Sequence, residues 1–471
     1  MSRPNVVLIF MDDWTHWALE SAQVQTPNLD RLVRRGTMYT QARNQGSWTG
    51  AVCVAARAML ISGRSLFHGR QAVEDPPTDG ETVPLLGQAF GAAGYDTSFT
   101  GKWHNPEKAL RRSYHRVGKH AGAMLVPAVM PDGSEDIGRP APGNTWSPTD
   151  PAGEGHWMRV GGGIVHSSEH WIDCALGFLE SRESAEPFFL HVALHAPHDP
   201  RQAPRRWLDA YPPGLIPLPP NLLPEHPFDQ GDYHIRDELL APFPRTVEAV
   251  RLHRREYFAI ASHADEQIGR LLDAVDALHE DTIVVFSGDH GLALGEHGLM
   301  GKQSMYEHSM RVPLVLAGPG VPAGVRDDAL VYQASIYPTL CALTGIPVPE
   351  GIEFPALFFP PPSPSGPLPL LGSANSEPLP ETAFGAYRHL QRMVRTRRWA
   401  LTAYAPARRV QLFDLKADPW QVEDLSGDPD HREVVDQLLE LLRARQTELG
   451  DDCGEWTAGI DDGWLAVRAN A

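Results

Sequence analysis

Runs of apolar and β-branched residues recur along the first 320 residues and alternate with segments whose apolar residues repeat at helical spacing. Continuous apolar runs are typical of strands that are buried on both faces of a parallel sheet. Strands are predicted at residues 6–10, 95–100, 188–194, 282–286 and 313–317. Helices are predicted between residues 26 and 36, after residue 53, and at residues 83–93, 248–278 and 331–344. This alternation predicts a doubly wound α/β domain with a mixed, mainly parallel sheet flanked by helices.

The pattern changes after residue 354. Residues 355–369 are rich in proline and include Pro360-Pro361-Pro362, which is typical of a linker. We therefore expect a large α/β domain at residues 1–354, a linker at 355–375 and a smaller domain at 376–471. Short strands at 393–396, 399–404 and 410–415 precede an amphipathic helix, which predicts a small antiparallel sheet with a helix packed on it. Residues 105–165 show no clear periodicity and are expected to form a long surface insertion.

Composition and charge argue against several classes of protein. The 471 residues carry a formal net charge of −18, which argues against binding to nucleic acid or to an anionic membrane surface. The four cysteines are far apart and show neither metal-knuckle spacing nor a disulfide framework. The N-terminal apolar run is too short for a secretory signal, and no run reaches transmembrane length. We expect a cytoplasmic protein, or a periplasmic or secreted one if a leader has been removed.

Charged residues collect where the predicted strands end. Asp12 and Asp13 follow the first strand, and Asp289 and His290 follow the fourth. Open α/β sheets bind ligands at this edge, where three carboxylates would repel one another unless a cation lay between them. Oxygen ligands suit a hard divalent ion such as Ca²⁺ or Mg²⁺. The alternative for Asp12-Asp13 is a solvated turn or a helix cap.

Cys53 and Arg57 form a Cys-x-x-x-Arg sequence at the start of a predicted helix. A free cysteine is often simply a small buried hydrophobic residue, and that interpretation stays open for the pentapeptide alone. A position near a helix N-terminus would instead place free backbone N–H groups and the positive end of the dipole beside the cysteine. Such a position favours an anion at the site.

Together with Ser62-Gly63-Arg64, the Cys53 segment resembles the signature of type I sulfatases, which belong to the alkaline phosphatase superfamily. Further segments resemble the same family in the same order along nearly the whole chain. They are Gly101-Lys102-Trp103-His104, Ala196-Pro197-His198-Asp199-Pro200, Phe286-Ser287-Gly288-Asp289-His290-Gly291, Gly295-Glu296-His297-Gly298, Gly301-Lys302, Arg311-Val312-Pro313 and Gln411-Leu412-Phe413-Asp414-Leu415.

The resemblance implies an alkaline phosphatase-like fold and a role for each matching residue. The implied metal ligands are Asp12, Asp13, Asp289 and His290, with Ca²⁺ as the expected ion and Mg²⁺ or Mn²⁺ as alternatives. Cys53 would be oxidised by a maturase to formylglycine, whose hydrate is the nucleophile. Arg57 would stabilise that hydrate, and Lys102 and Lys302 would hold sulfate oxygens. His198 would protonate the leaving group, and His104 would deprotonate the second hydroxyl of the hydrate.

The chain departs from the common family sequence at two places. Ala55-Ala56 stand where the common family sequence has Pro-Ser, so we expect incomplete conversion of Cys53 by the family's oxygen-dependent maturase. His290 stands where the family carries Asn or His.

The predicted substrate is a sulfated sugar or another small alkyl or aryl sulfate. The alternatives are a phosphonate monoester or phosphodiester hydrolase of the same superfamily, and a non-catalytic protein that binds sulfated ligands. His195 and His297 are expected to be structural or to line the substrate site.

Overall fold

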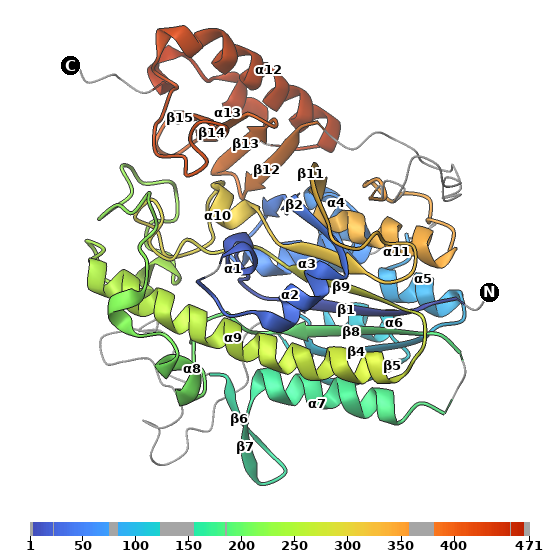
Figure 1. Ribbon diagram of the computed structural model, residues 1–471. Helices are drawn as coiled ribbons and strands as arrows, with labels where there is room; N and C mark the ends of the chain where they lie inside the picture. Colours follow the sequence, from blue (N-terminus) through green and yellow to red (C-terminus); the bar gives the residue numbers. More distant parts are fainter. Residues whose placement is uncertain are drawn as a thin grey trace.

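The computed structural model describes residues 3–21, 23–74, 83–122, 155–183, 186–357, 381–452 and 454–465. Figure 1 shows a large α/β body with a smaller sheet and its helices above it. The expected linker at 355–375 lies outside the described residues except for its first three positions. The division of the chain into domains at 1–354 and 376–471 stays a prediction.

An eight-stranded sheet forms the centre of the large body. Its strand order is β11-β2-β10-β9-β1-β8-β4-β5, and only β10 runs antiparallel to its two neighbours among these paired strands. The bounds are β1 (Asn5–Met11), β2 (Gly36–Arg43), β4 (Asp96–Lys102), β5 (Arg116–Ala121), β8 (Phe188–Leu194), β9 (Thr282–Gly288), β10 (Leu314–Ala317) and β11 (Val325–Tyr332). The strand β1 lies between β8 and β9, so the residues that follow it reach the middle of the sheet edge.

Helices cover both faces of this sheet. On β1, Val7, Ile9 and Met11 belong to one hydrophobic core, and the alternating residues Val6, Leu8 and Phe10 belong to the other. The first core is closed by α2 (Pro27–Arg34), α7 (Ser167–Glu180) and α9 (Val247–Ala277). The second is closed by α3 (Val52–Ser62), α5 (Leu86–Ala92), α6 (Glu107–Ser113) and α11 (Ile336–Thr344). The predicted doubly wound α/β class is confirmed, because the chain buries the sheet on both sides.

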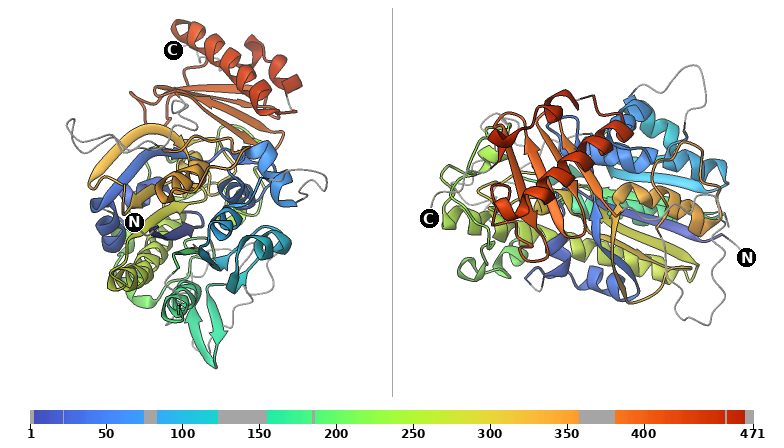
Figure 2. Two further views of the ribbon diagram at one scale, coloured as in Figure 1. Left: turned by 90° about the vertical axis from the view of Figure 1, so that its right-hand side faces the viewer. Right: turned by 90° about the horizontal axis from the view of Figure 1, so that it is seen from above.

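The smaller sheet has the order β15-β14-β13-β12-β3, and α12 packs on it (Figure 2). Its bounds are β3 (Gly46–Ser47), β12 (Ala383–Tyr387), β13 (Gln391–Arg395), β14 (Trp399–Tyr404), β15 (Arg409–Asp414) and α12 (Arg432–Leu449). The predicted antiparallel sheet with a packed helix is confirmed. The strand β3 comes from the N-terminal part of the chain and pairs in parallel with β12, which the sequence pattern did not predict.

The helix α3 is shared by two hydrophobic cores. Ala58, Leu60 and Ile61 face the core of the central sheet. Ala55, Ala56 and Met59 face the core beneath the smaller sheet and α12. Gly63 ends the helix in the left-handed conformation at φ 63°, which glycine adopts without steric cost.

Two expectations about secondary structure were wrong. The region 105–165 is not wholly an insertion, because α6, β5 at the sheet edge, β6 (Trp157–Val160) and β7 (Gly163–His166) lie within its described parts. Residues 331–332 end β11 instead of starting a helix.

The other α-helices are α1 (His16–Glu20), α4 (Leu66–Glu74), α8 (Arg205–Asp209), α10 (Glu307–Met310) and α13 (Gly454–Ala458). Within the described ranges, no helix combines the length and apolar character needed to cross a bilayer.

Candidate active site

The carboxyl ends of four neighbouring strands and the first turn of α3 meet at one place. The ends of β1, β4 and β9 supply Asp12-Asp13, Lys102 and Asp289-His290, and the loop after β8 supplies His198. Cys53 is the second residue of α3. All ten residues predicted from the sequence lie here, joined by the contacts described below, and nine of them are at most 5% exposed. His104, the tenth, is partly buried.

The three carboxylates and His290 form the centre of the site. Asp289 Oδ1 accepts hydrogen bonds from the backbone N–H groups of Asp13 and His290, at 3.1 and 2.9 Å. The His290 ring lies 3.4 Å from Asp289 Oδ1, 3.5 Å from Asp13 Oδ1 and 3.9 Å from Asp12 Oδ1. Burial, and then the charge of Asp12, raise the pKa of Asp289 well above its ordinary value. This packing of like charges requires compensation from cations.

The donor atoms at this centre suit a divalent metal ion. Asp12 Oδ1, Asp13 Oδ2 and His290 Nε2 are buried and have no hydrogen-bond partner among the described residues. Asp12, Cys53, Asp289 and His290 each offer a ligand atom, and these atoms lie within 4.8 Å of one another. Buried polar atoms without partners are costly, and a bound cation would satisfy them. The residues present therefore fit an oxygen-rich metal site with one imidazole donor.

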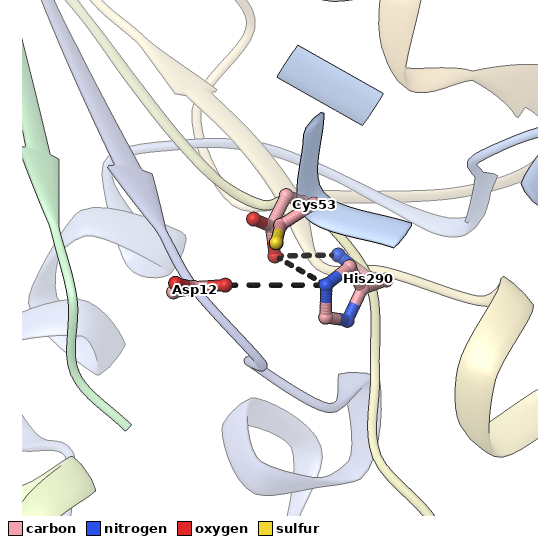
Figure 3. A group of neighbouring side chains, drawn as sticks. Asp12, Cys53 and His290 are labelled. Atoms are coloured by element: carbon pink, nitrogen blue, oxygen red, sulfur yellow. Dashed lines mark hydrogen bonds and ion pairs between the residues drawn. The ribbon is translucent and has the colours of Figure 1, made fainter. Parts of the chain in front are cut away.

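Cys53 points into this centre from the start of α3, as Figure 3 shows for Asp12, Cys53 and His290. Its Sγ lies 3.0 Å from His104 Nδ1 and 3.8 Å from Lys102 Nζ. Burial alone would raise the pKa of the Cys53 thiol, but the combined effect of Lys102, a hydrogen bond from His290 and Lys302 lowers it. Burial, and then Lys102, lower the pKa of His104 to about 2, which keeps this ring neutral.

Three cations pair with the three carboxylates. Lys102 Nζ contacts Asp12 Oδ2, and Lys302 Nζ lies 2.8 Å from Asp13 Oδ1. Arg57 Nη2 lies 3.1 Å from Asp289 Oδ2, and its Nη1 donates to the Lys102 carbonyl at 2.8 Å. Burial would raise the pKa of Asp12, but the charges of Lys102 and of the other cationic groups around it together bring the pKa well below its usual value. The site thus keeps charged groups of both signs in a buried setting.

His198 reaches the site from the loop after β8. It belongs with Asp12 and Asp13 to a second group of ligand atoms within 4.8 Å of one another. Its Nδ1 lies 2.6 Å from the Asp199 carbonyl oxygen, and because a carbonyl only accepts, Nδ1 carries a hydrogen. Nε2 is therefore the ring atom that is left for chemistry.

Several residues beside the site were not predicted. Arg236 contacts the Asp199 carboxylate, which itself lies 3.6 Å from His198 Nδ1. Burial would raise the pKa of Asp199, but His198 and Arg236 lower it below its usual range. Asp199 lies inside a quoted motif, whereas Arg236 lies in the long segment between β8 and α9 and carries no sequence signal.

The two histidines without assigned roles both make packing contacts. His195 Nδ1 accepts from the Trp171 indole N–H at 3.1 Å. The His297 ring stacks on Tyr306 with 3.8 Å between ring centroids. Both arrangements suit structural residues.

Comparison with known sequences identifies one family. The sulfatase family model matches residues 4–346. An ulvan-active sulfatase from Formosa agariphila is 29% identical over 467 residues, covering 96% of this chain and 82% of its own.

Two solved structures share the fold. A phosphonate monoester hydrolase from Silicibacter pomeroyi superposes with a TM-score of 0.72 at 20% identity and covers 96% of both chains. A protein solved with its substrate D-glucosamine-2-N,6-O-disulfate gives a TM-score of 0.70 at 20% identity, covering 96% of this chain and 100% of its own. Because the family model spans most of the chain, the chain belongs to the sulfatase family, whose members hydrolyse sulfate esters.

Proposed function

We propose that this chain hydrolyses small sulfate monoesters, with residue 53 as the formylglycine nucleophile beside a divalent metal ion. The observation that carries the proposal is the convergence of Cys53 on a buried centre of three carboxylates and His290 that contains unpartnered ligand atoms. When bound, the metal supplies Lewis acidity toward a sulfate oxygen, and the aldehyde hydrate supplies a hydroxyl nucleophile. We assign Asp12, Asp13, Asp289 and His290 as its ligands and favour Ca²⁺ because most donors are oxygens.

The cations hold the substrate in this proposal. Lys102 and Lys302 lie on the two sides of the carboxylate centre, and each pairs with an aspartate that the metal would also contact. With Asp12 and Asp13 as metal ligands, the ammonium groups of Lys102 and Lys302 would be available to hold sulfate oxygens. Arg57, anchored by Asp289 and the Lys102 carbonyl, would hold the hydroxyl group that attacks sulfur.

Two histidines move protons. His198 would carry a proton on Nε2 and deliver it to the oxygen of the departing alcohol, while Nδ1 stays bonded to the Asp199 carbonyl. The Asp199 carboxylate, 3.6 Å away, would stabilise the charged ring. His104 Nδ1 lies 3.0 Å from Cys53 Sγ, so its ring is placed to accept the proton of the second hydroxyl group as the aldehyde is restored.

The test combines mass spectrometry with turnover. A peptide containing residue 53 should show loss of the thiol and gain of an aldehyde, and specific activity should rise in proportion to the aldehyde fraction. Cys53→Ala should abolish turnover and leave metal binding intact. Full turnover by a preparation without any aldehyde would contradict the formylglycine assignment.

A second candidate is phosphonate monoester or phosphodiester hydrolysis, which the structural likeness to a phosphonate monoester hydrolase favours. These esters, like sulfate monoesters, carry one negative charge and would meet the same cations. Parallel kcat/KM values on aryl sulfate, aryl phosphonate and aryl phosphodiester esters decide between them. We expect the sulfate to be the best substrate, and we expect a sulfated sugar to fit the site, as the sugar disulfate does in the structural relative.

A further inference from the structure

Two buried histidines lie behind His198 and have no role in the mechanism above. His156 precedes β6, and His166 is the last residue of β7 and the N-cap of α7. Both are 0% exposed, and their rings stack with 5.0 Å between centroids and 4° between planes. They face the segment that carries His198, here called the 195–202 loop. Buried polar groups of this kind are held by specific hydrogen bonds, and the partners identify what they support.

The hydrogen bonds of His156 fix which ring nitrogen carries the hydrogen. Nε2 lies 2.9 Å from the carbonyl oxygen of His198, and Nδ1 lies 2.7 Å from Ser167 Oγ. Burial lowers the pKa of His156 to about 4, so the ring is neutral at pH 7 and has one N–H. Because a carbonyl only accepts, Nε2 donates to His198 and Nδ1 accepts from the Ser167 hydroxyl. The His198 carbonyl therefore requires this tautomer, and the Ser167 hydroxyl anchors the ring by donating to Nδ1.

His166 supports the other end of the same loop. Its Nδ1 accepts from the backbone N–H of Ser168 at 3.1 Å, so Nε2 donates to the Gln202 carbonyl at 3.0 Å. The backbone N–H of His156 also donates to Gln202 Oε1 at 2.9 Å. The loop is thereby fastened at residues 198 and 202 by a pair of stacked rings.

The bond to His198 matters because the His198 ring is oriented by its own backbone. Nδ1 donates to the carbonyl of the next residue, Asp199, so the ring position depends on the intervening peptide, whose carbonyl is that of His198 and accepts from His156. A turn of that peptide would swing Nε2 away from the leaving oxygen. Misplacement of a catalytic group by about 1 Å can cost on the order of 10²-fold in rate.

We propose that His156, with Ser167 as its hydrogen-bond donor, is a positioning residue that holds His198 in line with the leaving group. This inference rests on the proposed role of His198 as the proton donor. It gives the segment around residues 156–167 a catalytic purpose that its sequence does not reveal.

The test compares esters that need a proton in the transition state with esters that do not. Alkyl sulfates have poor leaving groups, and 4-nitrophenyl sulfate has a good one. His198→Ala should slow the alkyl sulfate by about 10²–10⁴-fold and the activated ester far less. His156→Phe, which removes the donor, should slow the alkyl sulfate by about ten- to a hundredfold and the activated ester by under about threefold. His156→Gln, which keeps an N–H donor, should recover most of the loss.

A double variant separates positioning from general damage. In the His198→Ala background, His156→Phe should add no further preference for the activated ester, because its effect passes through His198. If His156→Phe does not fold, Ser167→Ala is the second test. Loss of the hydroxyl that anchors the His156 ring should slow the alkyl sulfate selectively, by a smaller factor than His156→Phe does. His226→Gln is the control, because His226 is a buried histidine that donates to the Phe228 carbonyl and has no bond to the 195–202 loop.

The outcomes distinguish two failures. If His198→Ala slows both esters equally, the proposed role of His198 is wrong, and the inference falls with it. If His198→Ala is selective but His156→Phe and Ser167→Ala slow both esters equally, the proposed function stands and the positioning role is overturned. The same conclusion follows if His226→Gln produces as much selectivity as His156→Phe.

Discussion

At the level of single residues, each carboxylate of the active site is paired with a cationic side chain even without a metal. Each carboxylate has its own cation, because Asp12 contacts Lys102, Asp13 contacts Lys302 and Asp289 contacts Arg57. A divalent ion would therefore add two positive charges to a neutral centre, and an incoming sulfate ester would cancel one of them. In the proposed mechanism the metal would therefore serve the chemistry more than the fold, because the lysines and Arg57 already compensate the buried carboxylates.

Chelation should consequently separate activity from folding. Removal of divalent ions with excess chelator should abolish sulfate ester hydrolysis, while the far-UV circular dichroism spectrum stays unchanged and the melting temperature falls only slightly. Asp12→Asn should behave in the same way and should not be rescued by added Ca²⁺. Loss of the folded signal on chelation would show that the metal holds the structure together.

Buried histidines make stability depend on pH. Burial lowers the pKa of His226 to about 4, so it takes up a proton on unfolding at any pH between about 6.5 and 4. Its contribution is complete above pH 6.5 and is lost as the pH falls toward 4. His226→Gln should make the loss of unfolding free energy between pH 7 and pH 5 smaller by about 2 kcal/mol. Urea titrations at both pH values measure this, and identical losses in both proteins would refute it.

Among the secondary structure elements, β4 places two of the proposed catalytic residues by a close approach to β8. Gly101 pairs with Ala193 and has φ 103°, and a Cβ there would lie 1.8 Å from the Ala193 carbonyl oxygen. Lys102 and His104 follow directly, so any displacement of the strand end moves them. The glycine is required by both the backbone angle and the lack of space.

Gly101→Ala should therefore damage both stability and turnover. The strand must shift by more than a side chain can absorb, so we expect at least a tenfold loss of kcat/KM and a lower melting temperature. Ser98→Ala, on the same buried strand, is the matched control and should keep activity within about twofold. Wild-type activity in Gly101→Ala would show that β4 can move without displacing Lys102.

Whether a strand could be predicted from the sequence depended on how apolar the strand is. The strands β1, β8 and β9 are continuous apolar runs and were identified, whereas β2 contains Thr, Gln and Arg and was missed. The edge strand β5 is largely polar and gave no periodic signal. The ten candidate site residues could be predicted because they lie in contiguous motifs. His156 could not, because its partner His198 is 42 residues away and only the folded chain joins them.

On the scale of the whole molecule, the two sheets are joined through α3 and β3. One face of α3 packs under the smaller sheet, and β3 pairs with β12 from the C-terminal part of the chain. Residues 381–465 therefore complete the environment of the helix that carries Cys53. They cannot be treated as an appendage to an independent catalytic domain.

A chain ending at residue 357 should accordingly fail as an enzyme. It would expose Ala55, Ala56 and Met59 and leave β3 unpaired, so we expect poor solubility and no detectable turnover. Co-expression with a fragment of residues 381–471 should recover part of both. A soluble and active truncated chain would contradict this dependence.

The burial of α3 also implies that modification of Cys53 would have to precede the final folding of the chain. Cys53 is 2% exposed, and the helix that carries it is covered on both sides. An enzyme that oxidises this side chain must bind the surrounding peptide, which is possible only before the two cores close over it. Maturation and folding would then compete during synthesis, and a chain that folds first would keep its thiol permanently. The yield of active protein would depend on how slowly the nascent chain folds as well as on how much maturase the cell contains.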